Sequence, residues 1–166
     1  MALGINNQGQ VVGVSALNDQ ATPAQGHHAF LWTSGTGMQD LGALPGGATS
    51  VGLGINEAGD VVGQSMDAEG NPRGFLWHNG VMNDFNGLAT GSSLYLLFAE
   101  SINARGEIAG FGATEKGDVH GFVTVPVNGS HASWLVAESV RIALPEDVRK
   151  LVRERLPVSR FGRPVR

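Results

Sequence analysis

Short apolar runs separated by polar turns cover the first 136 residues of this chain, and one such run occurs three times. Its clear copies read Leu-Gly-Ile-Asn-x-x-Gly-x-Val-Val-Gly at residues 3–13 and 53–63, and a weaker copy lies at residues 100–110. The steps are 50 residues (5 to 55) and 47 residues (55 to 102). A repeat of this length is typical of solenoids, propellers and arrays, in which each copy is one supersecondary unit. The recurring residues are therefore expected to be structural first.

A second apolar run keeps the same period. It reads His-Ala-Phe-Leu-Trp at residues 28–32 and returns at residues 73–77 and 120–124, with steps of 45 (30 to 75) and 47 (75 to 122). Phe30 and Trp32 would point to one side of a strand, and Ala29 and Leu31 to the other. A strand that is apolar on both faces predicts sheets on both sides. Four-stranded meanders of about 45 residues stacked in this way are propeller blades.

Turn residues divide each copy into four strands. An Asn at the first turn position and a Gly at the fourth indicate a type I turn followed by a bulge. This pair occurs in every copy, as Asn6 and Gly9, Asn56 and Gly59, and Asn103 and Gly106. Asn-Gly at residues 79–80 predicts a tight hairpin. The same dipeptide at residues 128–129 places the fourth strand of the third copy at about residues 130–136.

The predicted fold is therefore all-β, a propeller-like array of three four-stranded antiparallel blades followed by a C-terminal helix. The repeat region is residues 1–136, with blades at about 2–44, 45–88 and 89–136. A basic segment, residues 137–166, contains a helix expected at about 145–156, because Pro and two acidic residues open an apolar stripe. The stripe consists of Leu144, Val148, Leu151, Val152 and Leu156. The aromatic residues expected to be buried at equivalent positions are Phe30, Trp32, Phe75, Trp77 and Phe122.

The two motifs together resemble the HAF repeats of bacterial extracellular proteins, which are named for a His-Ala-Phe run. His28-Ala29-Phe30 matches that run literally, whereas the second and third copies have Arg73-Gly74-Phe75 and His120-Gly121-Phe122. The resemblance covers about residues 2–136. It implies a β-propeller-like repeat protein that is extracellular or periplasmic, and it implies no enzymatic activity.

Composition and charge narrow the function further. The chain has 166 residues, 25 of them Gly, and no Cys, which excludes disulfides, thiol catalysis and thiolate metal sites. Residues 1–136 have a net charge of -8 and residues 137–166 a net charge of +4. An acidic repeat region disfavours nucleic-acid binding. No segment reaches transmembrane length and no signal peptide is visible, so a cytoplasmic location stays open. The start within a repeat suggests a truncated product.

Candidate chemistry is sparse. No catalytic, metal or cofactor motif is present. The candidate ligand-binding residues are His28, Arg73 and His120, which occupy the same repeat position before the third strand. A ring of His side chains there could bind a metal or an anion, but Arg does not ligate metals, and a hydrogen-bonded His at a strand start is the simpler interpretation. Asp67, Glu69 and Asn71 resemble the start of a calcium loop without its distal Glu, which favours a solvated turn.

The leading hypothesis is a non-enzymatic propeller-type repeat module for binding or assembly. One alternative is a carbohydrate-active enzyme with a shallow site at the blade centre, and another is a degenerate fragment without independent function. Three blades cannot close a ring, so self-association as a homodimer is expected, by completing a propeller or by pairing end blades. The C-terminal helix could instead cover one open flank. Membrane contact through the basic tail is the weaker possibility for that segment.

Overall fold

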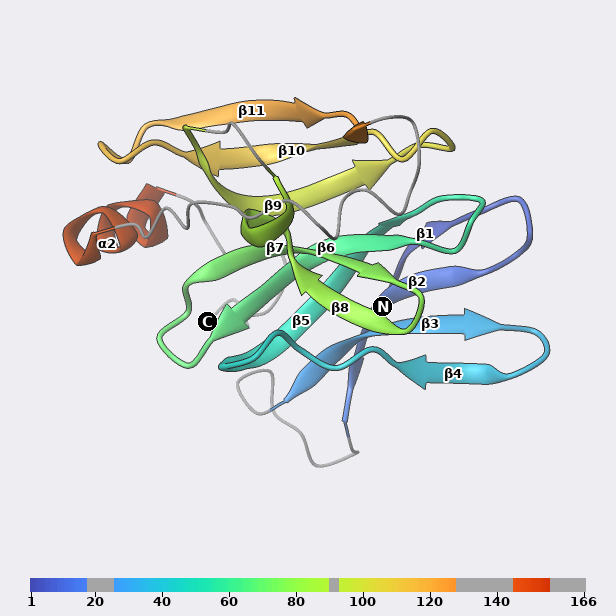
Figure 1. The fold of residues 1–166 in the computed structure, drawn as a ribbon. Coiled ribbons are helices and arrows are strands. Elements are labelled where there is room, and N and C mark those ends of the chain that lie inside the picture. Colours follow the sequence, from blue (N-terminus) through green and yellow to red (C-terminus); the bar gives the residue numbers. More distant parts are fainter. Residues whose placement is uncertain (18–25, 90–92, 128–144, 156–166) are drawn as a thin grey trace.

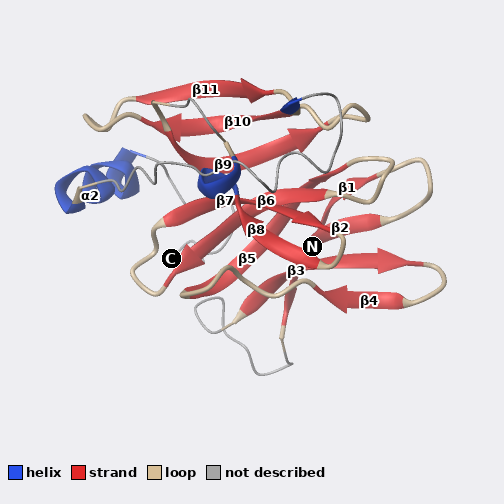
Figure 2. Cartoon of the chain, in the orientation of Figure 1, coloured by secondary structure: helices blue, strands red, loops and turns tan. Residues whose placement is uncertain are grey.

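In the computed structural model, residues 1–17, 26–89, 93–127 and 145–155 are described, and they form three antiparallel sheets and two short helices (Figures 1 and 2). Each sheet contains one sequence copy, and its strands are neighbours in chain order. Sheet 1 comprises β1 (Ala2–Ile5), β2 (Val11–Ala16), β3 (His27–Thr33) and β4 (Gly37–Asp40). Sheet 2 comprises β5 (Gly47–Ile55), β6 (Val61–Asp67), β7 (Pro72–His78) and β8 (Val81–Asp84). Sheet 3 comprises β9 (Tyr95–Ile102), β10 (Ile108–Ala113) and β11 (Val119–Thr124).

The mostly β prediction is thus confirmed, with meanders of four, four and three strands. The fourth strand predicted for the third copy, at about residues 130–136, lies outside the described residues. The turn chemistry explains where the strands end. In sheet 2 the side-chain oxygen of Asn56 accepts hydrogen bonds from the backbone N–H groups of Ala58 (3.0 Å) and Asp60 (2.9 Å), and Gly59 has a φ of 84°. The asparagines of the other two copies make the same pair of bonds.

A bulge makes one glycine of each second strand obligatory. The pairing between β5 and β6 shifts between Gly52 and Gly54, which leaves Leu53 as the extra residue. A Cβ atom on Gly63 would collide with the carbonyl oxygen of Val51 and would lie 2.9 Å from the Phe75 ring. The same steric conflict with a backbone carbonyl recurs at the equivalent glycines of the other sheets, Gly13 and Gly110. The last Gly of the recurring Val-Val-Gly run is therefore kept by packing rather than by an unusual φ.

Sheets 1 and 2 pack face to face, and sheets 2 and 3 pack through equivalent residues. Val12 and Leu31 of sheet 1 meet Ile55, Val61 and Phe75 of sheet 2 in one buried cluster. The next cluster repeats the arrangement one copy later, with Val62, Leu76, Ile102, Ile108 and Phe122. One interface is thus built twice, and each sheet contributes one defined face to each of its neighbours.

The three first strands, β1, β5 and β9, approach most closely where their side chains are smallest. A Cβ on Gly4 would lie 3.2 Å from the carbonyl oxygen of Leu53, and one on Gly54 would lie 3.0 Å from that of Glu100. The third copy has Ser101 at this position. Figure 1 shows the sheets spreading from these strands, with β1 to β4 descending on one side and β9 to β11 rising on the other. The three sheets therefore form a fan around their first strands.

The burial predicted for the aromatic residues is wrong at one position. Phe30 (6% exposed) and Phe75 (0%) are buried, and Trp77 and Phe122 are half-buried. Trp32 is exposed at 38%, because no sheet among the described residues covers its face of sheet 1. Its equivalent, Trp77, packs instead against the cluster between sheets 1 and 2. The sequence motif alone does not distinguish an end sheet from an internal one.

The two helices differ in how they could be foreseen. Helix α1 (Phe85–Leu88) has no counterpart in the prediction, since one turn containing Gly carries no helical period. Helix α2 (Glu146–Arg155) lies where the sequence predicts a helix. Its Val148 and Val152 are buried with residues of sheet 3, and Leu144 and Leu156 of the predicted stripe lie outside the described residues.

Replacing Gly63 by Ala is expected to lower the free energy of unfolding by about 3 kcal/mol or more, since the added methyl group meets backbone that cannot move alone. Urea denaturation monitors the loss. Gly35→Ala is the matched control, because a Cβ there meets nothing within 4 Å. Equal stability losses in both variants would refute the packing role of the bulge.

Candidate interaction surface

One face of sheet 1 exposes side chains that its neighbour sheet buries. This surface, named here the sheet 1 end face, consists of Ile5, Val11, Trp32 and Met38. Ile5 is 69% exposed and Met38 57% exposed. The equivalent Ile55 in sheet 2 is only 9% exposed, and the equivalent of Met38 packs against the buried cluster between sheets 1 and 2. The sheet 1 end face is thus the repeat equivalent of the surface through which sheet 2 packs on sheet 1.

The outer face of sheet 3, at the opposite end of the fan, also exposes positions that are buried in the other two sheets. The sheet 3 end face is defined by Ser101, Ala109, Gly121 and Val123, all of which are exposed. Val123 reaches 72% exposure, whereas its equivalents Leu31 and Leu76 are 6% and 5% exposed. The positions equivalent to Ala109 hold Val12 and Val62, both fully buried. The sheet 3 end face therefore corresponds to the other half of the recurring interface. Helix α2 covers the part of this face next to Phe111 and Ala113, as expected for a helix that covers one open flank.

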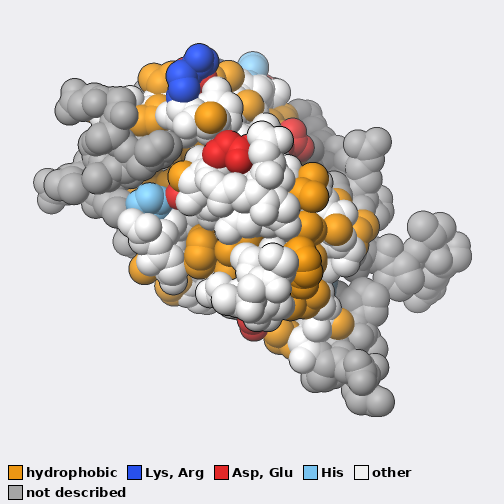
Figure 3. Space-filling model, turned by 90° about the vertical axis from the view of Figure 1, so that its right-hand side faces the viewer, with side chains coloured by type: hydrophobic (Ala, Val, Ile, Leu, Met, Phe, Trp, Pro, Cys, Tyr) orange, Lys and Arg blue, Asp and Glu red, His pale blue; other side chains and the backbone are white. Residues whose placement is uncertain are grey.

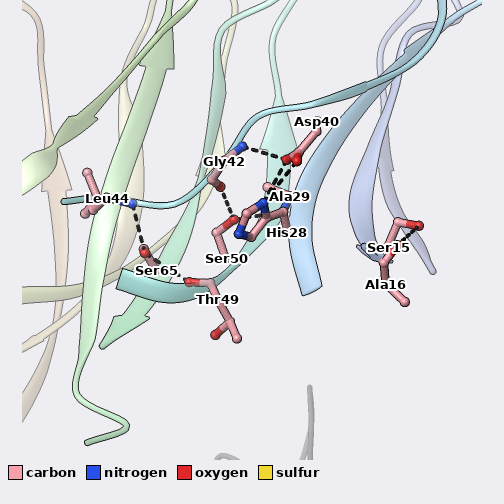
Figure 4. Close-up of polar contacts among 10 residues, drawn as sticks. All are labelled: Ser15, Ala16, His28, Ala29, Asp40, Gly42, Leu44, Thr49, Ser50 and Ser65. Atoms are coloured by element: carbon pink, nitrogen blue, oxygen red, sulfur yellow. Dashed lines mark hydrogen bonds and ion pairs between the residues drawn. The ribbon is translucent and has the colours of Figure 1, made fainter. Parts of the chain in front are cut away.

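Buried serines reinforce the interface between sheets 1 and 2 with backbone hydrogen bonds (Figure 4). The Ser50 hydroxyl oxygen on β5 accepts the N–H of Ala29 on β3 (2.8 Å) and donates to the carbonyl oxygen of Gly42. Ser65 on β6 accepts the N–H of Leu44 (3.2 Å) and donates to the carbonyl oxygen of Thr49 (3.0 Å). Sheet 2 therefore binds both the third strand of sheet 1 and the link between the two sheets, residues 41–46.

Ser15 occupies the equivalent position in sheet 1, on the face that no described sheet covers. It is the repeat equivalent of Ser65, and among the described residues its hydroxyl donates only a long bond (3.3 Å), to the carbonyl oxygen of Ala16. Figure 4 shows this side chain turned away from His28, although the two residues are paired across β2 and β3. The sheet 1 end face thus carries a polar group at the place where sheet 2 binds a link.

The predicted ligand residues lie on three different sheets and form no hydrogen bond with one another among the described residues. His28 Nδ1 lies 3.0 Å from a carboxylate oxygen of Asp40 on the neighbouring strand. Arg73 makes the equivalent pair with Asp84 (3.2 Å) and also donates to the carbonyl oxygen of Pro45 in the preceding link (2.7 Å). His120 is exposed. In sheets 1 and 2 the shared position thus serves a contact between strands, and in sheet 2 also a contact with the preceding link.

The two aspartate partners are residues that the sequence reasoning missed. Each closes a Met-x-Asp triplet in the fourth strand, at residues 38–40 and 82–84. Each also accepts a backbone N–H two residues later, from Gly42 (2.8 Å) and Asn86 (3.0 Å). The recurrence of this triplet in two copies was the available signal.

A second histidine–carboxylate pair is more buried. Nδ1 of His78 lies 2.5 Å from Asp60, whose other carboxylate oxygen accepts the amide of Asn56 (2.8 Å). The pair joins the turn after β5 to the end of β7 and is therefore structural.

Burial lowers the pKa of His27, and the adjacent His28 lowers it further.

Metal binding finds no support in the described part of the chain, where no cluster of three or more His, Asp or Glu could hold an ion. In the calcium-like triplet, Asp67 accepts both the backbone N–H and the side-chain amide of Asn71, each at 2.8 Å. That carboxylate closes its own turn, and the turn is not fully solvated as expected, because Asn71 is buried and also accepts a hydrogen bond from Arg153 of α2. No described helix is long and apolar enough to cross a membrane.

Figure 3 views the side of the fan on which the turns after β1, β5 and β9 lie. Hydrophobic side chains reach the surface there in several groups among polar ones. The turns after β1 and β5 bind each other, since Asn6 donates to the carbonyl oxygen of Asn56 (2.9 Å) and Asn7 to the carboxylate of Glu57 (2.7 Å). No family model matches the chain, and no curated protein or solved structure is similar enough to count as a match.

Replacing Ser65 by Ala is expected to cost about 1–3 kcal/mol of unfolding free energy, because the N–H of Leu44 is left buried without a partner. Ser15→Ala provides the matched control, with an expected change within about 0.5 kcal/mol at its more accessible position. Chemical denaturation of both variants at the same low protein concentration makes the comparison. A Ser15 loss as large as that of Ser65 would contradict the assigned roles.

Proposed function

We propose that this protein is a non-enzymatic, β-propeller-type repeat module that works in binding or assembly through its sheet 1 end face. The observation that carries the proposal is the exposure of Ile5, Trp32 and Met38 on a surface whose equivalent in sheet 2 is buried. An exposed apolar surface of this kind is a common site of protein association. Its partner must present a complementary apolar sheet face.

The propeller arrangement is part of the proposal. It is supported by the fan of meanders around β1, β5 and β9, and by the use of one interface twice. The resemblance to HAF repeats supports the same arrangement and an extracellular or periplasmic location. Propellers bury the faces of all their blades by closing a ring. An unclosed fan leaves its end faces for binding, apart from the part of the sheet 3 face against which Val148 and Val152 of α2 pack.

A carbohydrate-active enzyme is the alternative that one observation favours. His28 and Asp40 bring an imidazole and a carboxylate together on the sheet 1 end face, and Trp32 is exposed nearby in the same strand. Against it stands the equivalent pair of Arg73 and Asp84, in which Arg binds a backbone carbonyl and no acid–base role is available. The pair is thus better explained as one version of a contact that recurs between strands.

An apolar fluorescent probe tests the binding role of the sheet 1 end face directly. Bis-ANS is titrated into the protein at nanomolar protein concentration, where association between chains is minimal. Met38→Glu is expected to weaken probe binding about fivefold, because losing roughly 1 kcal/mol of apolar contact changes affinity by that factor.

Val81→Glu is the matched control, since Val81 has the same 57% exposure as Met38 but lies at the start of β8 in the internal sheet. Circular dichroism establishes that both variants keep the β fold. If the two substitutions weaken bis-ANS binding equally, or if neither weakens it, the sheet 1 end face is not a binding surface.

A further inference from the structure

We propose that the sheet 1 end face binds the sheet 3 end face of a second copy of this chain, so that two copies close one ring of six sheets. The inference rests on the proposed binding role of the sheet 1 end face and adds the identity of its partner. It assigns the interface to two surfaces on opposite ends of the fan rather than to one surface that pairs with itself.

The first argument is that the two end faces are complementary by construction. Inside the chain, the cluster between sheets 1 and 2 joins Leu31 to Val61 and Phe75, and Trp77 and Met82 pack against it. On the end faces, the same positions are taken by Val123 on one side and by Val11, Trp32 and Met38 on the other, whereas Phe30, at the position of Phe75, is already buried in the single chain. The sheet 3 end face of a second copy therefore offers the sheet 1 end face the same kind of surface that sheet 1 offers to sheet 2 inside the chain.

The second argument is polar. Sheet 2 binds the link from sheet 1 through Ser65, which accepts a backbone N–H, and Arg73, which donates to a backbone carbonyl. In sheet 1 these positions are held by Ser15 and His28. Within the described part of the chain, the Ser15 hydroxyl bonds only within its own strand, and the Asp40 carboxylate is bonded to Nδ1 of His28 rather than to Nε2. Both residues can therefore bind backbone groups of an incoming chain as well as its apolar side chains.

The third argument is the shape of the fan. Sheets 1 and 3 lie on opposite sides of sheet 2 and diverge from the first strands, as Figure 1 shows. A head-to-tail contact generates a closed ring when the rotation closes and an open filament when it does not. Two copies related by a two-fold axis close the ring when successive sheets are rotated by about 60°, so that the three sheets of each copy occupy half of the turn. Each dimer then contains the same end-face contact twice.

Charge exchange across the interface tests this arrangement. Met38→Glu and Val123→Lys are each expected to weaken the dimer at least about 100-fold, since a tenfold loss at each of two identical contacts multiplies. An equimolar mixture of the two variants is expected to form heterodimers at least about tenfold tighter than either homodimer. In that heterodimer one contact is unaltered and the other places Glu opposite Lys. Sedimentation velocity over a range of concentrations measures all three affinities.

The controls separate the possible outcomes. Val81→Glu is expected to dimerise like the unaltered chain, and mixing Met38→Glu with Val123→Glu is expected to give no rescue. An unaltered chain that stays monomeric up to about 1 mM, where specific contacts are no longer expected, overturns the inference, as do oligomers that keep growing with concentration. If Met38→Glu prevents association while Val123→Lys does not, two sheet 1 end faces pair with each other, and the inference fails while the proposed function stands. Loss of the bis-ANS difference between Met38→Glu and Val81→Glu marks failure of the proposed function itself.

Discussion

The packing of one sheet on the next is the interaction on which the rest of this structure depends. The strands β3 and β7 are apolar on both faces, so neither sheet 1 nor sheet 2 can bury its side chains by itself. Contact between sheets also requires the first strands to approach closely, which Gly4 and Gly54 permit because they carry no Cβ. Ser50 then satisfies backbone groups of sheet 1 at the buried surface. Fold, interface and proposed function all follow from this one contact.

The strands were predictable because their turns are chemically explicit. An Asn that accepts two backbone N–H groups and a Gly with positive φ end β1, β5 and β9 in the same way, and the sequence spells both residues in every copy. The Asn79-Gly80 hairpin is equally explicit, with φ values of 50° and 82°. Helix α1 could not be foreseen, because its N-terminal cap by Asp84 looks like the end of a strand until the chain is folded.

The surface was harder to predict than the strands. A repeat motif assigns the same environment to Trp32 and Trp77, but the position of a sheet in the stack decides which one is covered. Likewise, His28 and Arg73 look like ligand residues when the strand is viewed alone, and their contacts with Asp40 and Asp84 appear only once four strands are aligned. Repeat symmetry in the sequence predicts an interface, and the ends of the array show where that interface is unused.

Site-specific crosslinking tests the central claim, that the two ends of the fan are halves of one interface, most directly. The chain has no cysteine, so Met38→Cys combined with Val123→Cys introduces the only two thiols. With a short bismaleimide, this variant is predicted to give covalent dimers that do not grow into larger species on longer incubation. The variant with Val81→Cys and Val123→Cys is predicted to stay uncrosslinked. A ladder of growing oligomers, or equal crosslinking of both variants, would contradict the account.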